Sequence, residues 1–546
     1  MEVVIGSNIT IWNAPSAVKQ QIRKDLTFEN PEYTKMKRLG KRAWGIDKFI
    51  HVWQIDAVTG ALTVPRGYWA DLQPFIDQAR RVEHRRLLLP EVDFGSAIKL
   101  RDYQIPCVTS QPQGIICSPA RSGKTVISLA DIADKRQPAL WLTHTSELLD
   151  QSTLRAQQNL KNVGRIGQLG ANKWDYGDGK LAVGLIQAIL AFFEKATPEE
   201  KTEFVRRFGY ILVDECHHAS AETFYRVVSE FPAMFRKGVT ATPDRADGLE
   251  GLMYSCIGPM IHQVDREKLI AAGVILVPKL EFVYTEFGKN KGFTQGDEKS
   301  GKSFDAGDEQ MDFAGYMDDL IRDPARNQLI VDKLMEHGGN HCQLAISDRI
   351  EHCYLLRDLT EKVTKAAWGQ APRMAILTGK MLVTCEYWWG GEKECLCRGQ
   401  PPGSKKACMR WGKHSCRGLK EASRPRHERQ KLIKDLEEGK LDIVFATQLA
   451  REGLDVPKLD RMHIATPKRA AGAVEQEISR PCTPDPNNPN KTAIIIDYRD
   501  DLVGMFKAQG YARNKVYKKI GCQVPKKPRE RTQEQISHWL SNIPFN

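Results

Sequence analysis

Short apolar runs alternate with amphipathic stretches over most of this chain. Between Leu100 and about residue 270 the apolar runs are GIIC, ALWLT, AVGLI, YILVD and GVTA. A second series, CQLAI, MAILT, DIVFAT, RMHIAT and AIIIDY, occupies about residues 339–498. Buried strands that alternate with amphipathic helices are typical of a parallel sheet covered by helices on both faces. The pattern therefore predicts two consecutive α/β lobes.

The segments outside these lobes have other patterns. Residues 1–95 mix short apolar alternations such as ITIW and FIHVW with basic helical stretches, which predicts a small α+β domain. We expect the first lobe to occupy residues 96–275 and the second lobe residues 276–505. The second lobe carries a cysteine-rich insertion at 381–420, and a basic tail covers 506–546.

Composition and charge narrow the class of protein. The 546 residues are 41% hydrophobic and 27% charged, which is ordinary globular usage and excludes a fibrous or wholly disordered chain. No apolar run approaches the roughly 18 residues of a membrane span, and the N-terminus lacks a signal pattern. The 13 cysteines mostly stand singly in apolar surroundings, which favours a reducing compartment. We therefore expect a cytoplasmic protein with no membrane partner.

The excess of positive charge lies in two segments. The net charge of the whole chain is +12, of which residues 507–531 contribute nine basic and one acidic side chain. Residues 385–417 contribute seven basic and three acidic side chains. Concentrated positive charge binds polyanions through counterion release, and nucleic acid is the commonest such partner. A solvated basic tail is the alternative.

The segment SPARSGKT lies between a predicted strand and a predicted helix. Such a loop directs backbone N–H groups and a helix N-terminus toward phosphate. The lysine can reach the β- and γ-phosphates of ATP, and the threonine can bind Mg²⁺. The expected ATP-binding residues of this loop are Ser118, Ala120, Arg121, Ser122, Gly123, Lys124 and Thr125. Ser118 replaces the usual first glycine of GxxxxGK[ST], so the turn at which the loop begins is expected to differ.

Two acidic residues follow the apolar run YILV. Asp214 and Glu215 should lie at the carboxyl edge of the sheet, where ligands bind in open α/β folds. Asp214 can join Thr125 around Mg²⁺, and Glu215 can orient or deprotonate the attacking water. Paired acids after a strand are otherwise often helix caps, and this alternative stays open for the pair alone.

Together with the SPARSGKT loop before it, the segment Asp214-Glu215-Cys216-His217 resembles the DExH box of superfamily-two helicases and translocases. Further segments resemble other motifs of that family in the correct order: LRDYQ (100–104), THTSELLDQ (143–151), GLIQAI around Gln187, TATP (240–243), ISDRIEHC (346–353), TQLAREGLDVP (447–457) and QEISR (476–480). The first of these resembles the Q motif of the XPB-like and restriction-motor branches. The resemblance implies two RecA-like lobes that bind and hydrolyse ATP with Mg²⁺.

The resemblance also implies roles for single residues. Gln104 would read the adenine, and Gln476 and Arg480 would act on the phosphates, with Arg480 as the arginine finger. The remaining residues are of two kinds, coupling residues and strand-contacting residues. They are Thr240, Thr242, Gly453 and Asp455 for coupling, and Thr145, Gln187 and Thr447 for DNA contact. The final motif departs from the family pattern, because Ser479 replaces its glycine and Thr483 its second arginine.

The N-terminal segment resembles the leader domain of phage helicases of the UvsW type, which remodel branched DNA. Its basic residues (Lys35, Lys37, Arg38, Lys41 and Arg42) lie beside Trp44 and could meet a duplex, although an ordinary basic helix is an equal alternative. The combined prediction is a phage-encoded DNA helicase or translocase that acts on single-stranded, duplex or branched DNA in recombination, repair or replication. The alternatives are a restriction motor, an RNA helicase and a nucleotide-switched DNA-binding protein with weak ATPase activity.

The insertion contains five cysteines and one histidine in the pattern C-x9-C-x-C-x10-C-x5-H-x-C. Four thiolates, or three thiolates and His414, can hold tetrahedral Zn²⁺ and supply the core that a small hydrophilic segment lacks. The favoured ligands are Cys395, Cys397, Cys408 and Cys416. Reduced free thiols are the alternative, because the pattern is not the paired CxxC of common zinc fingers.

Overall fold

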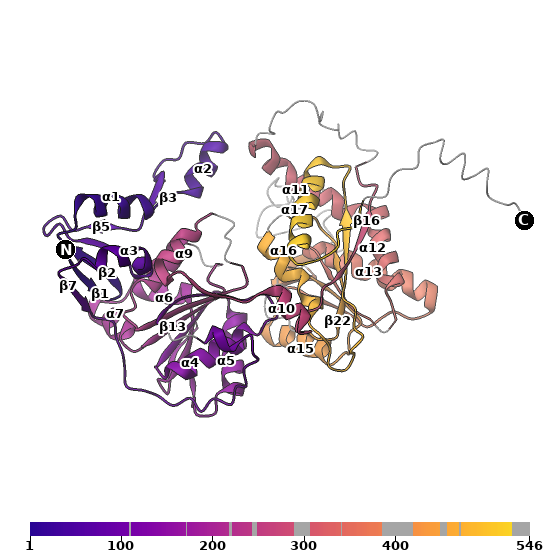
Figure 1. The fold of residues 1–546 in the computed structure, drawn as a ribbon. Coiled ribbons are helices and arrows are strands. Elements are labelled where there is room, and N and C mark those ends of the chain that lie inside the picture. Colours follow the sequence, from indigo (N-terminus) through magenta and orange to yellow (C-terminus); the bar gives the residue numbers. More distant parts are fainter. Residues whose placement is uncertain are drawn as a thin grey trace, which may run out of the picture.

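The computed structural model describes residues 1–108, 111–170, 172–217, 221–242, 248–288, 306–339, 341–384, 419–447, 456–468 and 471–526. These residues form three large sheets in chain order (Figure 1), together with two antiparallel two-stranded ribbons, β3–β4 and β19–β20. The first large sheet belongs to the N-terminal domain, and the other two large sheets are the centres of the two α/β lobes. No helix of the described segments is both long enough and apolar enough to cross a bilayer.

The N-terminal domain is a mixed sheet with helices. Its strand order is β5-β6-β2-β1-β7, in which β1 pairs antiparallel with β2 and parallel with β7. Alternate residues of β1 and β2 are buried, as expected for a sheet with one covered face. The elements are β1 Glu2–Ile5, β2 Asn8–Trp12, α1 Ser16–Asp25, β3 Thr27–Glu29, α2 Pro31–Arg38, β4 Phe49–His51, β5 Gln54–Ile55, β6 Leu62–Pro65, α3 Trp69–Ile76 and β7 Arg81–His84.

Lobe 1 has a sheet in the order β11-β10-β12-β9-β13-β14-β8-β15, parallel except for the β10–β11 pair. Its central strands are buried along their length, which explains their uninterrupted apolar runs. The strands are β8 Gln113–Cys117, β9 Ala139–Thr143, β10 Ile166–Gly170, β11 Lys173–Gly177, β12 Leu181–Leu185, β13 Tyr210–Asp214, β14 Phe235–Thr240 and β15 Met260–Gln263. The helices are α4 Lys124–Lys135, α5 Ser146–Asn159, α6 Ile186–Phe193, α7 Pro198–Val205, α8 Ala221–Val228, α9 Glu250–Ile257 and α10 Arg266–Ala271.

Lobe 2 has a parallel sheet in the order β16-β23-β22-β17-β21-β18. The strands are β16 Lys279–Tyr284, β17 Cys342–Ile346, β18 Met374–Leu377, β21 Ile443–Ala446, β22 Leu459–Ile464 and β23 Ile494–Arg499. The helices are α11 Ala306–Arg322, α12 Pro324–Glu336, α13 Ile350–Trp368, α15 Arg426–Glu437, α16 Ala471–Ile478 and α17 Gly504–Lys519. A separate antiparallel ribbon pairs β19 Lys380–Thr384 with β20 Leu419–Ser423.

The fold class predicted from the apolar runs is confirmed, because both lobes are parallel sheets that alternate with helices. The insertion predicted between residues 381 and 420 leaves and rejoins the lobe through the β19–β20 ribbon, in which Thr384 pairs with Leu419. Its cysteines lie between these strands, outside the described residues.

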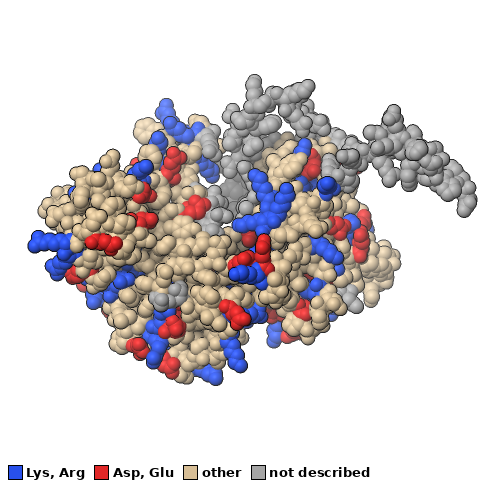
Figure 2. Space-filling view, in the orientation of Figure 1, with Lys and Arg blue, Asp and Glu red and all other residues tan. Residues whose placement is uncertain are grey.

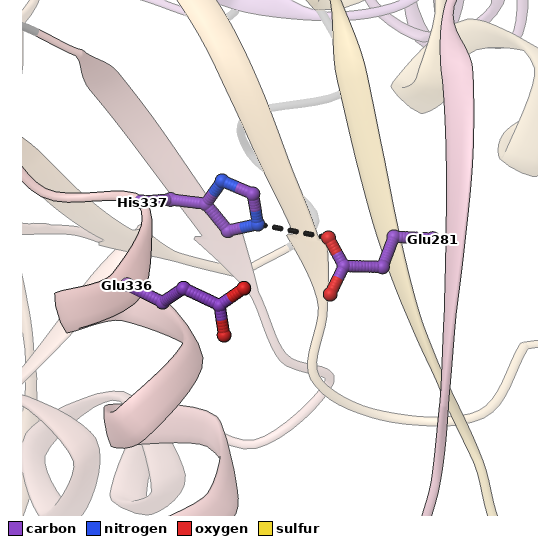
Figure 3. Close-up of side chains that lie close together, drawn as sticks. All are labelled: Glu281, Glu336 and His337. Atoms are coloured by element: carbon purple, nitrogen blue, oxygen red, sulfur yellow. Dashed lines mark hydrogen bonds and ion pairs between the residues drawn. The ribbon is translucent and has the colours of Figure 1, made fainter.

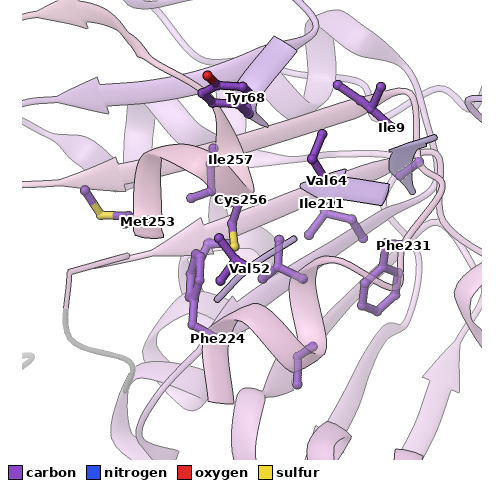
Figure 4. Packing of buried hydrophobic residues seen from close by; sticks show 14 of the residues in the cluster. Ile9, Val52, Val64, Tyr68, Ile211, Phe224, Phe231, Met253, Cys256 and Ile257 are labelled. Atoms are coloured by element: carbon purple, nitrogen blue, oxygen red, sulfur yellow. The ribbon is translucent and has the colours of Figure 1, made fainter. Parts of the chain in front are cut away.

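The N-terminal domain and lobe 1 share one hydrophobic core. Apolar side chains of both parts belong to a single buried cluster (Figure 4), which includes Ile9, Val52, Val64 and Tyr68 from the N-terminal domain and Ile211, Phe224, Phe231, Met253, Cys256 and Ile257 from lobe 1. The backbones also approach closely, since a Cβ atom at Gly67 would lie 2.4 Å from the Ser255 carbonyl oxygen. Only glycine fits at this position.

Two buried arginines fasten this shared core. Arg66 and Arg236 are fully buried, and each donates to backbone carbonyls of the other part. The Arg66 Nη1 atom lies 2.6 Å from the Ala233 oxygen, and the Arg236 Nη2 atom lies 3.0 Å from the Ser7 oxygen. Buried charged groups are costly unless they are hydrogen-bonded, so these contacts specify one docking geometry.

Candidate active site

The predicted phosphate loop joins β8 to α4 at the carboxyl edge of the lobe 1 sheet. Gly123 has φ +81° and Arg121 has φ +72°, so two residues of the loop are in the left-handed region. Lys124 is the first residue of α4, which directs the N-terminus of this helix at the cavity. Arg121, Gly123, Lys124 and Thr125 line that cavity together with Ala120. The arrangement of backbone N–H groups and a helix N-terminus suits a bound phosphate.

The backbone of Ser118 is not in the left-handed region, so a serine fits at this position of the loop. Its backbone N–H donates to the Thr240 carbonyl oxygen at 2.8 Å, and its hydroxyl bonds the buried Ser122 hydroxyl. The Ser122 hydroxyl also contacts the Pro119 carbonyl oxygen at 2.6 Å. Both serines are fully buried, and neither lines the cavity. Their hydrogen bonds stabilise the loop conformation instead.

Gln104 lies beneath the phosphate loop. Its Nε2 atom donates to the Ser122 carbonyl oxygen at 3.1 Å, and its Oε1 atom accepts from the Arg101 N–H at 3.0 Å. A Cβ atom at Gly123 would lie 2.6 Å from that Nε2 atom, which explains the glycine. In this structure both ends of the Gln104 amide contact the chain itself, and its contact with adenine stays a prediction.

The two acids after β13 have different surroundings. Glu215 has φ +43°, a strained conformation of the kind that concentrates at functional sites. Its Oε1 atom lies 3.0 Å from the Lys124 Nζ atom, so the phosphate-loop lysine is paired with the predicted base. Burial and the Glu215 carboxylate raise the pKa of Asp214 to about 6, opposed by the positive charges of Lys124 and His144. A bound divalent cation would return Asp214 to its ionised form.

The DExH histidine links the acids to the next motif. The His217 Nδ1 atom lies 2.7 Å from the Thr240 hydroxyl and 3.5 Å from the Glu215 carboxylate. The same hydroxyl accepts from the Thr242 N–H at 3.2 Å, and the Ala241 N–H donates to Glu215 at 3.4 Å. Thr240 and Thr242 therefore belong to one hydrogen-bonded group with Glu215 and His217.

Lobe 2 supplies the other wall of the cavity. Gln476, Ser479, Arg480 and Thr483, on and just after α16, line the same cavity as the phosphate loop and both acids. Its volume is about 380 Å³. The Ser479 hydroxyl lies 2.8 Å from the Gln476 carbonyl oxygen, so it bonds within its own turn. Residues separated by more than 350 positions in sequence thus meet at one site between the lobes.

A buried ion pair fixes α16 in place. The Lys468 Nζ atom lies 2.8 Å and 3.0 Å from the two carboxylate oxygens of Glu477, and 3.4 Å from Asp348. Lys468 and Glu477 have side-chain exposures of only 4% and 1%. Glu477 lies in the last turn of α16, three residues before Arg480, so the pair holds the helix end that precedes the arginine.

Replacing Glu477 with leucine is expected to lower the free energy of unfolding by about 3 kcal/mol, because the buried Lys468 keeps only its longer 3.4 Å contact with Asp348. Chemical denaturation would measure the change. The double variant Glu477→Leu/Lys468→Met is the control and should recover most of the loss. Equal stability of the wild type and the single variant would contradict the role of the pair.

The predicted strand-contacting residues follow the ends of sheet strands. Thr145 caps the N-terminus of α5 through a 3.3 Å bond from the Leu148 N–H, and Gln187 is an exposed residue of the first turn of α6. These positions come after β9 and β12, which are neighbouring parallel strands. Thr447 follows β21 in lobe 2, whereas Gly453 and Asp455 lie outside the described residues. All these roles stay predictions.

The structure adds residues that the motif strings did not single out. His144 follows β9, and Leu148, Gln151, Ser152, Arg155 and Asn159 form one face of α5 that lines the cavity. These α5 positions recur every three or four residues, so helical periodicity could have placed them on one face. Glu147 in the same helix pairs with Arg429 of α15 at 2.8 Å, an ion pair between the lobes.

Oxygen ligands for Mg²⁺ are present at the site, since the Thr125 hydroxyl and the Asp214 carboxylate line the same cavity. Elsewhere in the described residues Glu281, Glu336 and His337 come close enough to share a metal ion (Figure 3). However, the Lys333 Nζ atom lies 2.7 Å from both Glu281 and Glu336. The His337 Nε2 atom is 2.9 Å from Glu281. The lysine already balances these carboxylates, so we interpret the group as an ion-pair network.

The zinc prediction for Cys395, Cys397, Cys408 and Cys416 lies outside the described residues and stays a prediction. The cysteines of the described residues are buried and form no disulfide with one another: Cys107, Cys117, Cys216, Cys256, Cys342, Cys353, Cys482 and Cys522. Buried thiols without disulfides agree with the pattern expected from the sequence.

Known proteins match both walls of the cavity. Residues 93–245 match the family model "Type III restriction enzyme, res subunit", and residues 379–482 match "Helicase conserved C-terminal domain". The DNA 3'-5' translocase XPB2 of Sulfurisphaera tokodaii is 26% identical over 201 residues, which cover 36% of this chain and 43% of the relative. A protein of Sulfolobus islandicus filamentous virus with the provisional name helicase 22 is 23% identical over 424 residues, covering 74% of this chain and 65% of that protein.

The chain thus spans less than two thirds of the length of these curated relatives. Among solved structures, the crystal structure of T4 UvsW aligns with 95% of this chain and 98% of that chain, at 14% identity and a TM-score of 0.36.

Proposed function

From the premise that this chain belongs to the superfamily-two DExH helicases and translocases, we propose that it is an ATP-dependent motor that moves along or remodels DNA. The observation that carries the proposal is the composite cavity, in which Lys124, Asp214 and Glu215 of lobe 1 face Gln476 and Arg480 of lobe 2. A nucleotide held between these walls favours a closed arrangement of the lobes. Loss of the γ-phosphate removes the shared ligand, and the lobes separate.

Each wall has a distinct task in this proposal. Lys124 and the phosphate loop hold the β- and γ-phosphates. Thr125 and Asp214 would hold Mg²⁺, which would supply positive charge against the phosphate oxygens. Glu215 orients or deprotonates water once Lys124 has exchanged its ion pair with Glu215 for a contact with the phosphates of ATP. Arg480 stabilises the charge that develops on the γ-phosphoryl group. The Glu215–His217–Thr240 contacts connect this chemistry to β14 and the segment that follows it.

The finer proposal is that the polymer is DNA and that the protein remodels duplex or branched intermediates in phage recombination, repair or replication. Its support is the XPB-like Gln104 motif, the leader-like N-terminal segment and the basic character of the chain. Trp44 supports it further, because this side chain is 82% exposed close to the basic helix α2. Phosphate contacts carry little base information, so weak sequence preference is expected.

The test is ATP hydrolysis by the full chain with no polymer, single-stranded DNA, duplex DNA, a branched junction and RNA, all at one salt concentration. Strongest stimulation by duplex or branched DNA is the expected result. Stimulation by RNA alone would favour an RNA helicase instead. Strand-separation assays would then distinguish unwinding from translocation.

One rival function has an observation in its favour. Ser479 and Thr483 replace a glycine and an arginine of the family pattern and both line the cavity. A nucleotide-switched DNA-binding protein with weak ATPase activity would have such a modified wall. That function predicts slow hydrolysis that no polymer stimulates, together with nucleotide-dependent DNA binding.

A further inference from the structure

The C-terminal helix α17 has one face that the proposed ATPase cycle does not use. Its buried side, which includes Phe506, Arg513 and Tyr517, packs on lobe 2. Ala508, Tyr511, Lys515 and Lys518 are exposed and recur every three or four residues, so they form one stripe along the helix. We call these four residues the α17 stripe. Figure 2 shows Lys and Arg side chains gathered over the position of α17.

The composition of the α17 stripe suits a polyanion. Neither Lys515 nor Lys518 forms an ion pair within the described residues, so both charges face solvent. Tyr511 lies one turn before Lys515, toward the helix N-terminus. Its side chain is 57% exposed, whereas an aromatic residue of a hydrophobic core would be buried. A hydroxyl-bearing ring beside two ammonium groups provides a phosphate hydrogen bond or a stacking surface together with charge.

The helix is held rigidly at its buried side. Arg513 donates to both carboxylate oxygens of Asp497 at 2.8 Å and 3.0 Å, and the Tyr517 hydroxyl donates to Asp497 at 3.0 Å. A Cβ atom at Gly510 would lie 2.4 Å from the Arg499 guanidinium. Because the backbone is fixed in this way, the stripe presents its side chains without loss of backbone entropy on binding.

The same helix contacts the element that carries the arginine finger. Lys519 pairs with Glu475 of α16 at 3.3 Å, and the Arg513 Nη1 atom donates to the Lys468 carbonyl oxygen at 3.3 Å. Lys468 in turn holds Glu477 of α16. A ligand on the α17 stripe would therefore sit on a helix packed directly against α16.

We propose that the α17 stripe is a contact of lobe 2 with the phosphate backbone of duplex DNA, separate from the loops that follow the strands. Tyr511 and Lys518 are about 10 Å apart along the helix axis at about 1.5 Å per residue. That length corresponds to about three nucleotides of one strand at about 3.4 Å each. The proposal rests on the proposed function, because it assumes that the motor acts on DNA.

The test compares the full chain with the double variant Lys515→Gln/Lys518→Gln, with duplex binding measured by fluorescence anisotropy over a series of salt concentrations. The matched control is Lys362→Gln/Lys365→Gln, two exposed lysines of α13 in the same lobe. The stripe variant should bind about 10-fold more weakly near 0.1 M salt, with the slope of log K against log salt reduced by about 2. The control should bind like the wild type.

The outcomes separate the two proposals. If the wild type does not bind DNA, the proposed function fails, and the α17 contact fails with it. If the wild type binds and the stripe variant keeps its affinity and salt slope, only the α17 contact is overturned. Equal losses in the stripe variant and the control would also overturn it, because net charge alone would then account for the effect. Tyr511→Ala is a second variant, expected to weaken binding with an unchanged salt slope.

Discussion

Replacing Arg480 with alanine is expected to lower the rate of ATP hydrolysis by about 10³- to 10⁵-fold, the range by which an arginine finger accelerates phosphoryl transfer. The physical reason is the position of Arg480 on the lobe 2 wall, facing the phosphate loop across the cavity. Single-turnover hydrolysis with saturating DNA measures the loss. ATP affinity, measured with a fluorescent nucleotide, should change much less, because the lobe 1 wall is intact.

Two further variants make this prediction specific. Arg480→Lys keeps the charge but loses the planar fork, and should recover only a small part of the rate. Arg357→Ala removes a half-buried arginine of the same lobe, with a side-chain exposure of 36%, and should hydrolyse ATP like the wild type. An Arg480→Ala rate within about tenfold of the wild type would mean that the finger is another residue.

Replacing Glu215 with glutamine is expected to lower turnover by about 10²- to 10⁴-fold, the usual contribution of a general base. The substitution keeps the size of the side chain and removes its charge. It also removes the partner 3.0 Å from the Lys124 Nζ atom, which ATP must otherwise displace. Nucleotide affinity should therefore be equal to or higher than that of the wild type, which a nucleotide titration would show.

A matched control for this variant is Glu194→Gln, which neutralises an exposed carboxylate of the same lobe. Its turnover and affinity should equal those of the wild type. If Glu215→Gln lost nucleotide binding together with turnover, Glu215 would have a structural role in the phosphate loop instead of a role in hydrolysis.

The parts of the fold that apolar runs predicted are those buried on both faces. β9, β13, β17 and β21 are such strands, and their sequences are nearly free of polar residues. The strands β11 and β16 were not predicted, because they lie at sheet edges and mix charged with apolar residues. Partial exposure of an edge strand weakens the hydrophobic signal that local pattern analysis depends on.

The site residues also fall into two groups, those that the sequence alone could indicate and those that depend on how the lobes pack. The phosphate loop and the acids after β13 are short strings with a local physical meaning, so the sequence alone could indicate them. The meeting of Lys124 with Arg480 depends on how two lobes pack, which no local pattern contains. The Lys468–Glu477 pair was equally hidden, since two charged residues in a sequence are expected to be exposed.

The continuous core between the N-terminal domain and lobe 1 changes how a truncation should be interpreted. Removing the first 90 residues would expose the apolar side chains of Ile211, Phe224 and Ile257. It would also remove the Ser7 carbonyl oxygen that accepts a hydrogen bond from Arg236. Such a protein would expose a broad apolar surface of the kind that causes aggregation. Loss of activity after that deletion would therefore reflect disruption of the lobe 1 core, and would not show that the N-terminal domain binds a ligand. Point substitutions on the solvent side of the domain, for instance at Trp44, are therefore the informative way to ask what it binds.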